Sequence, residues 1–121
     1  VRNARALARE LERAGWRIVS GGTDTHLFLV DTWARGIGGA DAGARLEKAG
    51  IIVNKNTIPF DGRAPKDPSG IRLGTAALTT RGMKERDMKA IAGMIHAALM
   101  EEDISIVRRG VARVTRAFPI P

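Results

Sequence analysis

The chain has 121 residues, 44% of them hydrophobic, which suffices for one domain with a hydrophobic core and is too short for two. The absence of cysteine excludes disulfides and thiolate chemistry and fits a cytoplasmic protein, and two histidines far apart in the sequence argue against a metal site. The net charge of +7 is dispersed and only two Trp and three Phe are present, so we expect solvated helix faces and no nucleic-acid binding. No apolar run is long enough to cross a membrane.

Hydrophobic periodicity in the first half of the chain predicts helices and short strands. Leu7 and Leu11 recur at helical spacing before Gly15, which is a typical helix stop. In chain order, the expected elements are a helix over 1–15, strands over 16–20 and 26–31 around a turn at 21–25, a loop over 36–39, a helix from Asp41 to Gly50 and a strand over 51–53. Because the chain begins at Val1 inside an expected helix, we expect the natural protein to be longer.

The second half predicts a loop, one strand and further helices. A loop rich in proline and charge runs from Pro59 to Pro68, and Thr75 is expected to cap a helix after the strand 71–73. Two amphipathic helices then follow, the first marked by Met88, Ile91, Ala92, Ile95 and Leu99, and the second by Ile104, Val107, Val111, Val114 and Phe118 between a cap at Asp103 and a stop at Pro119. These elements predict the α/β class, as an α+β sandwich in which a small, mainly antiparallel sheet packs against helices.

The strand over 71–73 carries a permanent positive charge at its centre. Ile71 and Leu73 alternate with Arg72, so the arginine is expected on the face opposite to the two apolar side chains. A guanidinium fork held on a stiff strand, beside a helix N-terminus, is suited to binding a carboxylate through two hydrogen bonds. The alternative is an exposed arginine that pairs with a nearby acidic residue of the same chain.

A second unusual run, from Asn54 to Asp61, places polar side chains where an apolar stretch ends. It begins with Asn54, Lys55 and Asn56, followed by an apolar and proline-containing segment. One reading is a polar strand end whose amides satisfy backbone groups of a turn. Lys55 is expected to be structural.

These two runs resemble serine hydroxymethyltransferase, the pyridoxal-phosphate enzyme that moves a one-carbon unit between serine and tetrahydrofolate. The Ser-Gly-Ile-Arg-Leu-Gly-Thr run from Ser69 to Thr75, the Thr-Thr-Arg-Gly that ends at Gly82, and Asn-Lys-Asn carry the resemblance. It extends over essentially the whole chain, but it covers only the C-terminal small domain of that family.

The resemblance implies that residues 1–121 form a single C-terminal small domain of a fold-type I pyridoxal-phosphate enzyme, and that the cofactor-binding large domain is absent from this chain. The lysine that forms the Schiff base is then expected upstream, so no catalytic residue is assigned here and the fragment alone is expected to be inactive. The full enzyme is expected to be a cytoplasmic homodimer that converts serine and tetrahydrofolate to glycine and 5,10-methylenetetrahydrofolate.

The same resemblance implies the binding residues. Arg72 is expected to bind the carboxylate of serine or glycine. Asn56 is expected to contact the pterin of folate, because an amide offers a donor and an acceptor together. Ala64, Pro65 and Lys66 are expected to form a loop on the folate side.

The chain departs from the family pattern at several positions. Lys66-Asp67-Pro68 stands where an apolar residue, Val and Thr are common, so only main-chain contacts are expected at Lys66. Ala76 replaces the usual proline, which loosens the helix start but is not expected to move Arg72. Thr25 stands where asparagine is usual, and this turn is expected to be structural. His26 and His96 lie in apolar runs and are expected to be core histidines.

Three alternatives stay open at this point. A different fold-type I pyridoxal-phosphate enzyme would also carry a carboxylate-binding arginine, although folate use best explains the Asn-Lys-Asn run. A stand-alone basic binding module would bind nucleic acid in a strongly salt-dependent way. A purely structural domain would tolerate replacement of Arg72.

Overall fold

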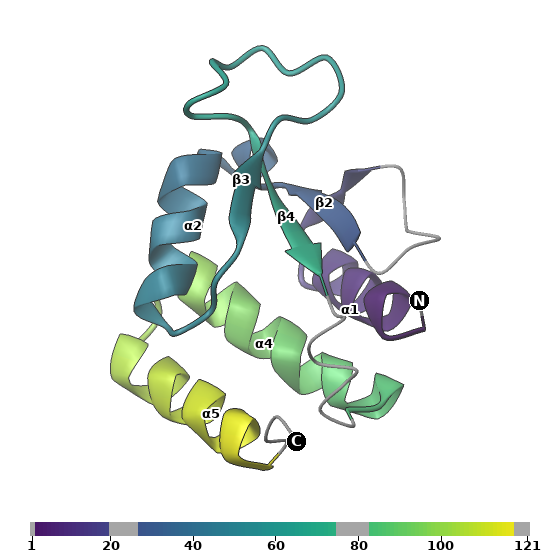
Figure 1. Cartoon of the computed structure of the whole chain (residues 1–121), viewed down its shortest axis with the longest axis vertical. Helices are drawn as coiled ribbons and strands as arrows, with labels where there is room; N and C mark the ends of the chain where they lie inside the picture. Colours follow the sequence, from purple (N-terminus) through teal and green to yellow (C-terminus); the bar gives the residue numbers. More distant parts are fainter. Residues whose placement is uncertain (1, 20–26, 75–82, 118–121) are drawn as a thin grey trace.

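The computed structural model describes residues 2–19, 27–74 and 83–117, which form a four-stranded antiparallel sheet packed against helices (Figure 1). The strand order is β1-β2-β4-β3. The elements are α1 (Arg2–Arg13), β1 (Arg17–Ile18), β2 (Leu27–Asp31), the 3-10 helix η2 (Thr32–Arg35), α2 (Gly39–Lys48), β3 (Asn54–Asn56), β4 (Gly70–Gly74), the 3-10 helix η3 (Glu85–Asp87), α4 (Met88–Leu99) and α5 (Ile104–Ala117). The α+β architecture with a small antiparallel sheet is confirmed.

The sheet has an apolar face and a polar face. Phe28 pairs with Leu73, and Val30 with Ile71, across the two central strands, and these four side chains are buried. They belong to one hydrophobic core with residues of α1, α2 and α4, and α5 packs against α4 (Figure 1). Because side chains alternate along a strand, the residues between them face away from this core.

The helix ends follow the sequence signals. Gly15 has a φ of 97°, and the N–H of Trp16 donates to the carbonyl of Leu11 at 3.0 Å, so the predicted stop of α1 is confirmed. At the start of α5, Asp103 Oδ1 accepts a hydrogen bond from the N–H of Ser105 at 3.0 Å, which confirms the predicted cap. Within the three described ranges, no helix is both long and apolar enough to span a bilayer.

The predicted strand over 51–53 is wrong, because β3 is formed by Asn54–Asn56 instead. Ile51 and Val53 do pack against the core, but Ile52 is 77% exposed. This segment connects the end of α2 to the start of β3. The apolar side chains of this run therefore indicate contact with the core and not pairing with a neighbouring strand.

Two further boundaries differ from the expectation. α2 begins at Gly39, before Asp41, because the carbonyl of Pro68 accepts the N–H of Gly39 at 2.7 Å and extends the hydrogen-bonded start of the helix. The predicted strand over 16–20 is limited to Arg17–Ile18. The expected turn at 21–25, the cap at Thr75, His26, Ala76 and the helix stop at Pro119 lie outside the described residues.

Candidate functional site

Arg72 lies at the centre of β4 on the polar face of the sheet. It pairs with Leu29 of β2 on one side and with Asn54 of β3 on the other. Its side chain is exposed, whereas Ile71 and Leu73 on either side of it are buried, as the alternation predicted. Within the described part of the chain, Arg72 forms no ion pair and no side-chain hydrogen bond.

Asp31 is an acidic residue on the same face of the sheet as Arg72, but its carboxylate binds other groups. It pairs with Gly70 in the register, so it stands diagonally across from Arg72, within the range that a long side chain spans. However, its Oδ2 accepts from Arg17 Nη1, and its Oδ1 accepts from the N–H of Ala34 at 3.1 Å. The described residues therefore give no support to Arg72 as one half of an internal ion pair.

Two amides line the edge of the sheet beside Arg72. Asn54 pairs with Arg72, and Asn56 pairs with Gly70, so the three polar side chains share one face. The Nδ2 of Asn56 donates to the carbonyl of Thr57 at 2.9 Å, which shows that this amide does satisfy a local backbone group. Its Oδ1 accepts no hydrogen bond from the described residues and so remains available as an acceptor.

Gly70 permits the close approach of the strands at this edge. A Cβ at this position would lie 2.8 Å from the carbonyl oxygen of Val30 and 2.9 Å from Cγ2 of Ile58. Any larger residue would therefore push β4 away from its neighbours and displace Arg72 and Asn56 relative to one another.

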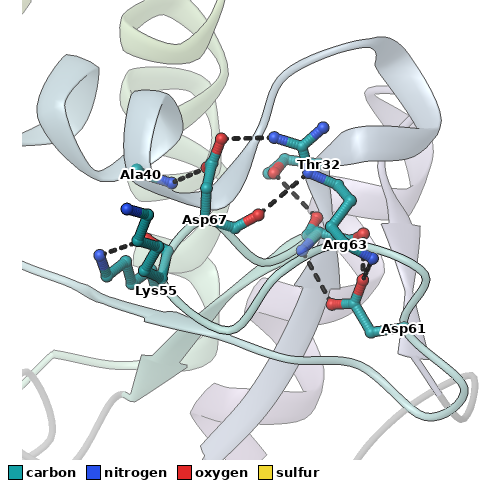
Figure 2. Close-up of polar contacts among 8 residues, drawn as sticks. Thr32, Ala40, Lys55, Asp61, Arg63 and Asp67 are labelled. Carbon is teal, nitrogen blue, oxygen red and sulfur yellow. Dashed lines mark hydrogen bonds and ion pairs between the residues drawn. The ribbon is translucent and has the colours of Figure 1, made fainter.

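The loop over 57–69, which connects β3 to β4 and extends beyond the sheet, is organised by Asp61 (Figures 1 and 2). The carboxylate accepts hydrogen bonds from the backbone N–H groups of Ile58, Arg63 and Ser69 at 3.2, 2.9 and 2.9 Å, and from Ser69 Oγ at 2.7 Å. The backbone hydrogen bond from Ser69, followed by that from Arg63, holds the pKa of Asp61 well below its usual range. The sequence analysis assigns no role to Asp61. The signal for its role is an aspartate in a turn that contains proline, because aspartate often accepts the backbone N–H two residues further on.

The tip of this loop contains the three residues expected on the folate side. The N–H of Asp67 donates to the carbonyl of Ala64 at 2.9 Å, so Pro65 and Lys66 are the central residues of a β-turn, with proline at its favoured position. Lys55 Nζ donates to the carbonyl of Lys66 at 2.6 Å (Figure 2), which agrees with a structural role for Lys55. The side chains of all three tip residues are exposed, and the Lys66 N–H forms no hydrogen bond within the described residues.

His96 lies elsewhere, in the helical layer. Its Nδ1 accepts a hydrogen bond from Nε1 of the buried Trp16 at 2.9 Å, and the two rings meet edge to face with centroids 5.9 Å apart. These contacts bind His96 to a buried side chain, but His96 itself is half-buried, so it lies at the margin of the core and not inside it as predicted. The described residues contain no cluster of acidic and histidine side chains that would hold a metal ion.

Within the described residues, an arginine without an ion pair thus lies on the polar face of the sheet, beside two amides of β3, in a domain of the α+β class. The family model of serine hydroxymethyltransferase matches residues 1–95. The chain is 54% identical over 99% of its length to the serine hydroxymethyltransferase of Acidobacterium capsulatum, 50% identical over 100% to that of Rhodopirellula baltica, and 48% identical over 99% to that of Koribacter versatilis. The chain therefore belongs to the serine hydroxymethyltransferase family, and it spans 29%, 30% and 29% of the length of these relatives, respectively.

Proposed function

We propose that this chain is the C-terminal small domain of a pyridoxal-phosphate-dependent serine hydroxymethyltransferase, and that Arg72 binds the carboxylate of serine or glycine. The observation that carries the proposal is the exposed guanidinium of Arg72, which no described acidic residue neutralises although Asp31 shares its face of the sheet. A planar fork fixed on a central strand favours two-point binding of a carboxylate and so orients the amino acid.

The described residues fit the substrate better than the cofactor. Arg72, Asn54 and Asn56 offer a cation and two amides, while the neighbouring Lys55 ammonium is already bound to the Lys66 carbonyl. We therefore assign the pyridoxal phosphate to the remainder of the whole protein. When it is bound there, it stabilises the carbanion formed at the α-carbon of the amino acid.

Folate binding is assigned to the edge of β3 and the loop tip. The free Oδ1 of Asn56 offers an acceptor for a pterin N–H. The exposed turn Ala64–Lys66 offers main-chain groups, including the free N–H of Lys66. Both lie at the end of the sheet that carries Gly70, two residues from Arg72, so the amino acid and folate would bind side by side.

The test uses the full-length protein with Arg72→Lys and Asn56→Ala, and with Arg109→Lys on the exposed face of α5 as the matched control. Lysine keeps the charge but loses the fork, and each charged hydrogen bond is worth about 1.5–3 kcal/mol, so we expect serine kcat/KM to fall roughly tenfold to a hundredfold or more in Arg72→Lys. Asn56→Ala is expected to raise the KM for tetrahydrofolate more than the KM for serine. Serine kinetics that are the same in Arg72→Lys and in the control would favour a purely structural domain.

A further inference from the structure

The turn Ala64–Lys66 is flanked by two side chains that bind each other. Arg63 Nη2 forms an ion pair with Asp67 Oδ2, and Arg63 Nε donates to the main-chain carbonyl of Asp67 at 3.1 Å (Figure 2). One guanidinium therefore holds both the side chain and the backbone of the residue on the far side of the turn. With the hydrogen bond from Asp67 to Ala64, this closes the segment 63–67 into a small ring of contacts.

The pair is also fixed to the body of the domain. Asp67 Oδ1 accepts the N–H of Ala40, in the first turn of α2, at 3.2 Å, where a negative charge is favoured (Figure 2). The guanidinium of Arg63 lies 3.8 Å from the centre of the Trp33 ring, in a cation–π contact. On the other side stands Gly38, where a Cβ would lie 2.8 Å from Arg63 Nη2 and 2.9 Å from Asp67 Oδ1.

We propose that Arg63 and Asp67 are positioning residues that hold the turn Ala64–Lys66 in the conformation that binds folate. The inference rests on the proposed function. The carboxylate of Asp67 supplies both an ion pair to Arg63 and an acceptor for the first turn of α2. A turn that is ordered before binding spares the ligand the entropy of ordering it.

Three variants of the full-length protein separate the contacts. Asp67→Asn removes the ion pair but keeps an acceptor for Ala40. Arg63→Met removes the ion pair and the cation–π contact, and the double variant removes these two and still keeps the acceptor for Ala40. Arg108→Met on the exposed face of α5 is the matched control. Because one or two residues of the turn lose their order, we expect the KM for tetrahydrofolate to rise roughly fivefold to thirtyfold in each single variant.

Two results distinguish positioning from other roles. The KM for serine and the affinity for glycine are expected to stay within about twofold of the parent. The double variant is expected to raise the KM for tetrahydrofolate no further than the single variant with the larger effect, since both single variants remove one shared interaction. The rate of tryptic cleavage after Lys66 is expected to rise in parallel with the KM for tetrahydrofolate.

Specific outcomes would overturn the proposal. If cleavage accelerates while the KM for tetrahydrofolate stays at the parent value, the pair orders a turn that folate does not use. If Arg63→Met raises that KM and Asp67→Asn leaves both it and the cleavage rate unchanged, Arg63 contacts the ligand itself. If Asn56→Ala also leaves tetrahydrofolate use unchanged, the proposed function fails with it, and the cleavage rate still reports whether the pair orders the turn.

Discussion

The hydrogen bond between Trp16 and His96 links the segment between α1 and β1 to α4, and it leads to a prediction about stability. Trp16 is only 2% exposed, and its Nε1 donates to His96 Nδ1 at 2.9 Å. His96→Leu leaves this buried N–H without its acceptor, which costs about 1–3 kcal/mol of the free energy of unfolding. At about 2.1 cal/mol/K of unfolding entropy per residue, a chain of 121 residues loses roughly 4–12 °C in Tm.

Thermal unfolding of the 121-residue chain, followed by circular dichroism, measures this loss. His96→Gln keeps an acceptor and is expected to lower the Tm by less than His96→Leu. In the background of Trp16→Phe the N–H is absent, so His96→Leu is expected to cost clearly less than it does in the parent. An equal cost in both backgrounds would refute the assignment of the stability to this hydrogen bond.

Three other predictions concern the loop and the isolated chain. Phe60 has a φ of 57° and is the third residue of a turn in which the N–H of Asp61 donates to the carbonyl of Ile58. Glycine adopts this φ without strain, so the free energy of unfolding of Phe60→Gly is expected to be about 1 kcal/mol higher than that of Phe60→Ala. Equal stabilities of the two variants would contradict the strain. Because the pKa of Asp61 is lower in the folded state than its ordinary value of 3.8, the ionised carboxylate stabilises the fold above that pH, and this stabilisation is lost as the pH falls below it. The Tm difference between the parent and Asp61→Asn should therefore be full at neutral pH and shrink below about pH 4, and a difference that does not depend on pH would contradict this. The isolated chain, treated with pyridoxal phosphate, serine and borohydride, is expected to give no stoichiometric adduct and no glycine, and both products together would mean that it is a complete enzyme.

The features that the sequence predicted well depend on neighbours along the chain. The opposite faces of Ile71 and Arg72 follow from the alternation of a strand, and the stop at Gly15 and the cap at Asp103 follow from local backbone geometry. Each of these features is determined by residues close to it in the chain, so the sequence pattern alone suffices to predict it.

The features that it missed depend on contacts between segments. The place of β3 is decided by where the chain meets β4, which the apolar run 51–53 does not encode. Asp61 and Asp67 look like ordinary loop residues until the closure of the loop brings Ser69 and the start of α2 to their carboxylates. Of the candidate site, the face on which Arg72 lies was predictable, and the contacts that fix the loop were not.

The most direct test of the carboxylate-binding role of Arg72 compares glycine with glycinamide as inhibitors of serine turnover in the full-length protein. The two ligands differ only in the group that Arg72 is proposed to bind. We expect the parent to prefer glycine strongly, and Arg72→Ala to reduce this preference roughly a hundredfold or more, because two charged hydrogen bonds are lost. An unchanged ratio of the two inhibition constants in Arg72→Ala would show that the carboxylate is bound by another residue.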